Sequence, residues 1–141
     1  MELSCMLDPE EVKNWLQKAE NDFQGALDLS RRRKRPLPDL VCFHCQQAVE
    51  KYMKALLVYN EIGFPKTHDL LMLLTLIQPA NPQLTLHREW FEILNPYSVQ
   101  FRYPGDQTNN DEARLAIKTV KKIRKLLLNL FPPALTQKIK Q

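Results

Sequence analysis

The stretch from Leu40 to Asn60, LVCFHCQQAVEKYMKALLVYN, limits the possible folds more than any other part of the chain. It contains no Gly and no Pro, and its apolar residues recur with the period of an α-helix. They fall in an arc of roughly 160°, which is wide enough to contact two or three neighbouring helices. We therefore expect a central, buried helix. The residues of this arc are Val41, Cys42, Cys45, Ala48, Val49, Tyr52, Met53, Ala55, Leu56 and Tyr59.

The opposite side of this helix mixes polar and apolar residues. Phe43 and Leu57 lie among Gln47, Glu50 and Lys54, so this side has neither a solvent pattern nor a core pattern. A second copy of the chain would cover such a surface. We therefore expect a homodimer through the face formed by Phe43, Gln47, Glu50 and Leu57.

Further helical patterns are separated by prolines, which break helices. Asp8 and Pro9 are expected to start the first helix. Gly63 is expected to be a left-handed cap after the central helix. Thr67 is expected to cap a short third helix. The expected helices span about 8–33, 40–60, 67–77, 82–94 and 110–131, and the final residues are expected to fray. A length of 141 residues suits one domain over 1–141, with its core at about 8–131. The sequence predicts an all-α, up-and-down bundle of four to five helices.

Cations gather in two places, although the net charge is only +4. The run from Arg31 to Arg35 is either a solvated helix end or a phosphate-binding patch, and it has no interleaved aromatic residue with which to contact bases. The last helix carries a row of cations, the cationic ridge, and the simpler interpretation is again that these side chains are solvated. The ridge consists of Arg114, Lys118, Lys121 and Lys125, with Lys122 and Arg124 beside them.

Several classes of protein do not fit the composition. No stretch approaches the 18 apolar residues of a membrane span, and the first residues lack a signal-peptide pattern. Three cysteines, an odd number, favour a reducing cytoplasm. Cys42 and Cys45 share a helix face, but the sequence offers no further ligand cluster for zinc. We expect a cytoplasmic protein without a membrane partner, metal or cofactor.

The segment from Tyr97 to Asn109 is the longest irregular stretch. Its aromatic rings and Arg102 could stack on a base and bind a phosphate through a bidentate guanidinium. Alternatively, Tyr97 and Tyr103 anchor the loop on the core. Loops carry function more often than core helices do, and both readings stay open.

The run FHCQQAVEKYMKALL, the later KTHDLLMLL, Tyr97 and the tripeptide Arg102-Tyr103-Pro104 together resemble the signature of HEPN domains. These are small all-helical domains similar to the substrate-binding domain of kanamycin-type nucleotidyltransferases. The resemblance implies nucleotide binding and a small nucleotidyltransferase as partner, sometimes as a toxin and antitoxin pair. The ligand contacts that we expect are Arg102, Tyr97 and Tyr103, with Lys51, Lys54 and His44 on the adjoining side of the central helix.

A ribonuclease toxin is the alternative function. HEPN-like ribonucleases carry an Arg followed, after four to six residues, by a His. None of His44, His68 and His87 follows an Arg at that spacing, and no His follows Arg102. The expected function is therefore non-catalytic binding of a nucleotide or another phosphate-bearing ligand, with RNA as a further possible ligand. A pure interaction scaffold is a third possibility.

Overall fold

The computed structural model describes residues 7–99, 105 and 107–139, and this part of the chain contains helices but no strand. The prediction of an all-α fold is confirmed. The short helix α6 is an addition to the five helices expected, and none of the described helices is long and apolar enough to cross a lipid bilayer. In chain order the elements are α1 (Pro9–Ser30), α2 (Pro38–Tyr59), α3 (Leu70–Ile77), the 3-10 helix η2 (Pro82–His87), α4 (Arg88–Leu94), the 3-10 helix η3 (Asn95–Ser98), α5 (Asn110–Leu128) and α6 (Pro133–Thr136).

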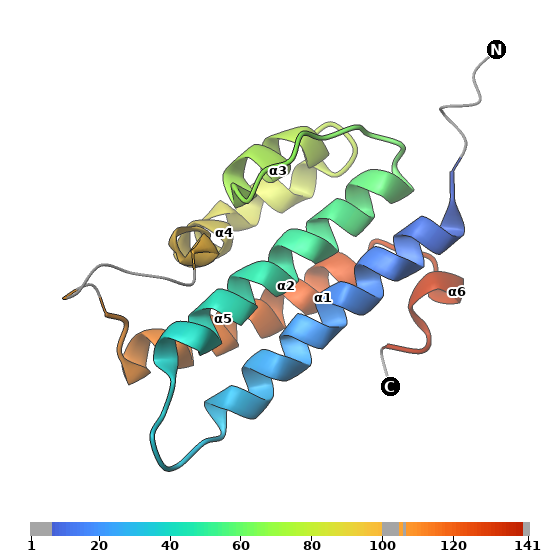
Figure 1. Ribbon diagram of the computed structural model, residues 1–141. Helices are drawn as coiled ribbons and strands as arrows, with labels where there is room; N and C mark the ends of the chain where they lie inside the picture. The colour runs from blue at the N-terminus through green and yellow to red at the C-terminus, as the bar shows by residue number, and fades with distance from the viewer. Residues whose placement is uncertain (1–6, 100–104, 106, 140–141) are drawn as a thin grey trace.

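Helix α2 lies at the centre of the bundle (Figure 1). It packs most extensively on α1, then on α5, and it also contacts α3 and η3. Every residue of the predicted apolar arc is buried except Tyr59, which is partly exposed. The width of the apolar arc thus explains why α2 has neighbours on several sides.

The helix starts follow from their capping side chains. The Asp8 carboxylate accepts a hydrogen bond from the Glu10 N–H at 3.0 Å, as expected for the start of α1. The cap of α3 is Asp69, whose Oδ1 accepts from the N–H groups of Leu71 and Met72. The expectation for Thr67 was wrong by two residues, because its hydroxyl instead accepts the N–H of Asp69 and so orients the capping residue.

The end of α2 also differs from expectation. Glu61, not Gly63, has the left-handed backbone, with a φ of 58°. The N–H of Ile62 donates to the Leu57 carbonyl at 2.9 Å and that of Glu61 to the Val58 carbonyl at 3.0 Å, which is a Schellman motif. The packing of Ile62 against the core holds this turn although its left-handed residue is not glycine.

The predicted dimer face is partly wrong. Leu57 is fully buried in the core of the single chain, and Glu50 is 3 % exposed and bonded to His68 of the same chain. The prediction failed at these two residues because the segment after α2 folds back over this side of the helix. Phe43 and Gln47 remain partly exposed, so any contact with a second copy would involve them without Leu57 and Glu50.

The segment after α5 does not fray over its described residues. Helix α6 packs on α1, and Thr136 is fully buried. Arg124, expected on the exposed ridge, instead turns inward, where its Nη2 donates to the Ile139 carbonyl at 2.9 Å. Its guanidinium also lies 4.5 Å from the centre of the Phe23 ring. The ridge is therefore made of the other cations of α5.

Candidate functional site

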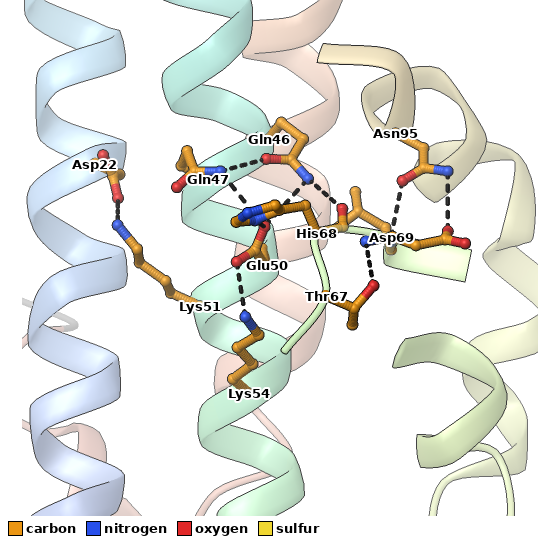
Figure 2. A network of polar contacts seen from close by, with 11 residues as sticks. Asp22, Gln46, Gln47, Glu50, Lys51, Lys54, Thr67, His68, Asp69 and Asn95 are labelled. Atoms are coloured by element: carbon orange, nitrogen blue, oxygen red, sulfur yellow. Dashed lines mark hydrogen bonds and ion pairs between the residues drawn. The ribbon is translucent and has the colours of Figure 1, made fainter. Parts of the chain in front are cut away.

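Polar side chains form two neighbouring clusters along the side of α2 that lies between α1 and the segment leading into α3 (Figure 2). We call this set the α2 network. Each cluster is built on one carboxylate, which is held by a lysine and a histidine of its own. Its members are Asp22 of α1, His44, Gln46, Gln47, Glu50, Lys51 and Lys54 of α2, and His68 just before α3.

Asp22 connects α1 to α2. Its Oδ1 lies 2.9 Å from His44 Nδ1 and its Oδ2 lies 2.5 Å from Lys51 Nζ. Burial raises the pKa of Asp22, but the hydrogen bonds and charges of His44 and Lys51 outweigh it and leave the pKa below its ordinary value. The carboxylate therefore stays ionised, and it neutralises the lysine beside it.

Glu50 is the more buried of the two carboxylates, with 4 % of its side chain exposed. Its Oε2 accepts from Lys54 Nζ at 2.9 Å, and its Oε1 lies 3.0 Å from His68 Nδ1. The amides of Gln47 and Gln46 lie at 3.4 and 3.5 Å from the same Oε1. These donors together compensate the cost of burying a carboxylate.

The three ligand contacts predicted on α2 are thus already bonded inside the protein. His44 and Lys51 meet on Asp22, and Lys54 is held by Glu50 with its ammonium 5.6 Å from the Trp15 ring centre. A phosphate would have to compete with these carboxylates. Their role as ligand contacts stays a prediction.

The loop contacts lie elsewhere. Tyr97 belongs to η3, is partly exposed, and donates its hydroxyl to Glu112 Oε1 of α5 at 2.8 Å. This bond ties η3 to α5, as the anchoring alternative requires. Arg102 and Tyr103 lie outside the described residues.

Two histidines of the α2 network are arranged for acid–base chemistry. His44 and His68 each direct Nδ1 at a carboxylate, and their side chains are 30 % and 67 % exposed. A neutral histidine that donates from Nδ1 carries its lone pair on Nε2, where it can accept a proton. His87 differs, because its ring stacks on Trp90.

A cavity of about 310 Å³ lies where the loop between α1 and α2 meets the start of α5. We call it the arginine cavity. Three arginines and no acidic residue line it, beside an apolar wall. Its lining residues are Leu29, Ser30, Arg32, Arg33, Pro36, Leu37, Pro38, Val41, Asn110, Ala113, Arg114 and Ile117.

Sequence reasoning missed the carboxylates that organise the interior. Glu20 lies four residues after Leu16 and three before Phe23, so its place at one edge of the buried stripe of α1 was visible in the spacing. Asp22 lies three residues after Ala19 and four before Ala26, at the opposite edge of the same stripe, so the spacing gave the same signal for it. The Arg31–Arg35 run was noted, but its apolar wall comes from α2 and α5 and appears only in the fold.

Comparison with known proteins adds one finding. The family model described as HEPN domain matches residues 12–130, from the first turn of α1 to just beyond α5. No curated protein and no solved structure matches significantly. Because the family model covers most of the chain, including the α2 network and the arginine cavity, this protein belongs to the HEPN domain family.

Proposed function

We propose that this protein is a non-catalytic HEPN domain that binds a nucleotide or another phosphate-bearing ligand in the arginine cavity. The observation that carries the proposal is the cavity itself, whose lining combines three arginines with an apolar wall. The site differs from the ligand contacts expected from the sequence, because it uses the basic run after α1, which the sequence offered as an alternative phosphate-binding patch. The expected contacts were Arg102, Tyr97, Tyr103, Lys51, Lys54 and His44.

The charges of the cavity favour an anion. Arg32 and Arg33 are exposed and have no ion-pair partner among the described residues, while Arg114 pairs with the exposed Asp111. Guanidinium groups bind phosphate oxygens in a bidentate manner. The two unpaired arginines are therefore the primary phosphate contacts.

The capping box at the start of α5 reduces what the backbone there can offer an anion. Asn109 and Glu112 form a capping box that occupies the N–H groups of both residues, and it adds a negative charge. The arginine side chains thus supply the attraction.

The apolar wall suits the remainder of a nucleotide. Val41 is buried, and Leu37 and Ile117 are partly buried along the same cavity. A volume of about 310 Å³ lies at the small end of the range of ligand pockets, which favours a single nucleotide over a polymer.

Isothermal titration with ATP, GTP, AMP and inorganic phosphate tests this proposal. We expect saturable binding of at least one nucleotide, and a Kd about tenfold higher for Arg33→Gln, because a lost charge-assisted hydrogen bond costs about 1.5 kcal/mol. Arg31→Gln is the matched control, since Arg31 is adjacent and exposed but pairs with Asp28 at 3.5 Å and does not line the cavity. Absence of heat with all four ligands, or an equal loss in Arg31→Gln, would contradict the proposal.

We also propose a homodimer and a small nucleotidyltransferase partner, on the basis of the resemblance to HEPN proteins that act in this way. Light scattering after size exclusion measures the first, and co-purification with a co-expressed nucleotidyltransferase measures the second. A stable complex combined with no nucleotide binding would favour the pure scaffold.

One observation favours a second function, metal-independent RNA cleavage. His44 and His68 each have a carboxylate at Nδ1, so one could accept the proton of a ribose 2′-hydroxyl while the other, protonated, donates to the leaving oxygen. Labelled RNA with EDTA present tests this function. Cleavage lost in His44→Ala and His68→Ala but kept in His87→Ala would replace the binding proposal with the catalytic one.

A further inference from the structure

An aromatic pair lies beside α5, away from the sites described above. The rings of His87 and Trp90 stack with their centres 4.1 Å apart and their planes 23° from parallel. The ammonium of Lys122, from α5, lies 5.6 Å from the centre of the Trp90 ring. Both rings are partly exposed, so a tryptophan accessible to solvent is in direct contact with a lysine of the cationic ridge.

The lysines around this contact are not neutralised. Lys118, Lys121, Lys122 and Lys125 are all exposed, and none forms an ion pair within the part of the chain that the structure describes. They fall within about 100° of one another on the helix, and Lys118 and Lys125 are about 10 Å apart along its axis. This arrangement forms a continuous positive strip two turns long.

The acidic residues nearby do not cancel that strip. Glu92 pairs with Arg88 at 3.3 Å, within α4. Glu89 is exposed on α4 and forms no ion pair with the described lysines. The strip therefore has four lysines against one uncompensated carboxylate on the adjoining helix.

We propose that Trp90 and His87, together with the lysine strip, form a binding surface for single-stranded nucleic acid. An unpaired base stacks on the Trp90 ring in place of the Lys122 ammonium, and that ammonium moves to a neighbouring phosphate. Such surfaces combine a positive track for the backbone with aromatic platforms for the bases. The Arg31–Arg35 run lacked an aromatic residue, whereas here α4 supplies one from a different part of the chain.

The surface favours single strands over duplexes. In a duplex the base faces are stacked on each other, so Trp90 could contact only the backbone and would add nothing to the attraction of the lysines. This surface is independent of the arginine cavity, so either proposal can fail without the other.

The fluorescence of Trp90 itself reports on binding. In a Trp15→Phe background Trp90 is the only tryptophan of the chain, and stacking of a base should quench its emission. We would titrate this variant with a single-stranded RNA and a single-stranded DNA, each about 16 nucleotides long, and with the matching duplex. We expect saturable quenching by single strands and weaker binding of the duplex.

Two variants locate the surface, measured by anisotropy of a labelled single strand. Trp90→Leu should raise the Kd about tenfold or more, because stacking contributes about 1–3 kcal/mol per base. Lys118→Gln with Lys122→Gln should raise the Kd and lower the salt slope by about 1.4, which is about 0.7 for each phosphate contact. These exposed lysines can be changed without affecting the core, so this second variant keeps the test valid if Trp90→Leu fails to fold.

The matched control is Lys18→Gln with Lys66→Gln, which removes the same charge from exposed lysines of α1 and of the connector before α3. The proposal is overturned if this control weakens binding as much as the strip variant does. Equal affinity for the duplex, or binding without a change in Trp90 emission, overturns it as well.

Discussion

Arg124 of α5 and Glu20 of α1 form a two-point ion pair within the bundle, with Nη2 2.7 Å from Oε1 and Nε 3.0 Å from Oε2. The hydroxyl of Tyr52 on α2 donates to the same Oε2 at 2.6 Å. Burial, followed by the contact with Glu20, raises the pKa of Tyr52, so this hydroxyl keeps its proton. Three helices are thus joined through one carboxylate.

Breaking this pair should destabilise the bundle. Glu20→Gln leaves the Arg124 charge only 20 % exposed and without its anion, and we expect a loss of about 3 kcal/mol in the free energy of unfolding. Urea denaturation measures it. Arg88→Gln, which breaks an exposed pair on α4, is the control and should cost less than about 1 kcal/mol. Equal costs for the two variants would show that the interior pair is not structural.

The pH dependence of stability should reflect Asp22. Its pKa is lowered in the folded protein, so its contribution is complete above the unfolded pKa of about 4 and is lost as the pH falls through the folded value. At pH 7 we expect Asp22→Asn to cost about 2 kcal/mol, because hydrogen bonds between charged groups are lost. That difference from the parent should shrink below about pH 4 in urea titrations.

The control for this measurement is Asp28→Asn, an exposed aspartate later on α1. Because its pair with Arg31 is exposed, the substitution should cost less than about 1 kcal/mol at pH 7. A difference for Asp22→Asn that persisted unchanged to pH 3 would contradict the lowered pKa.

Substitutions of Leu57 and Phe43 should distinguish an effect on folding from an effect on assembly. Leu57→Ala removes a fully buried side chain and should cost about 2–5 kcal/mol. Phe43→Ala alters a partly exposed ring and should cost less. Thermal denaturation and light scattering together report both effects. A Leu57→Ala protein that kept its stability but lost an oligomeric state would restore the original dimer face.

Glu61→Gly should stabilise the protein. Glu61 has a φ of 58° and its side chain is exposed, so glycine relieves the left-handed strain without removing a packed group. We expect a gain of about 0.5–1 kcal/mol in urea denaturation. Gly63→Ala is the comparison, because Gly63 lacks a positive φ and a Cβ there meets no atom within 4 Å, so alanine should be tolerated. A loss of stability in Glu61→Gly would show that the cap does not store strain.

The sequence predicted the helical elements well because their information is local. The apolar period identified the buried arc of α2, and the prolines located the breaks between helices. Leu57 was predicted on a dimer face but lies in the core, and this difference shows the limit of the reasoning. A helical wheel assigns a face to a residue, but it does not say whether the same chain returns to cover that face.

The charged interior was harder to predict for the same reason. Arg124 stands between Lys122 and Lys125 of the cationic ridge, yet Glu20, more than a hundred residues earlier, draws it inward. Lys54 is likewise 9 % exposed because Glu50 lies one turn before it and aromatic rings surround it. Such placements depend on partners that only the tertiary fold brings into reach.

The donors around Glu50 have a consequence for how this protein can diverge. Lys54, His68 and the two glutamines share one buried acceptor, so a substitution of any one of them leaves the others imperfectly matched. Lineages that lose Glu50 should therefore replace several of these positions together. Substitutions at this part of α2 would then occur together. Phe43, which is not part of this set, would change independently.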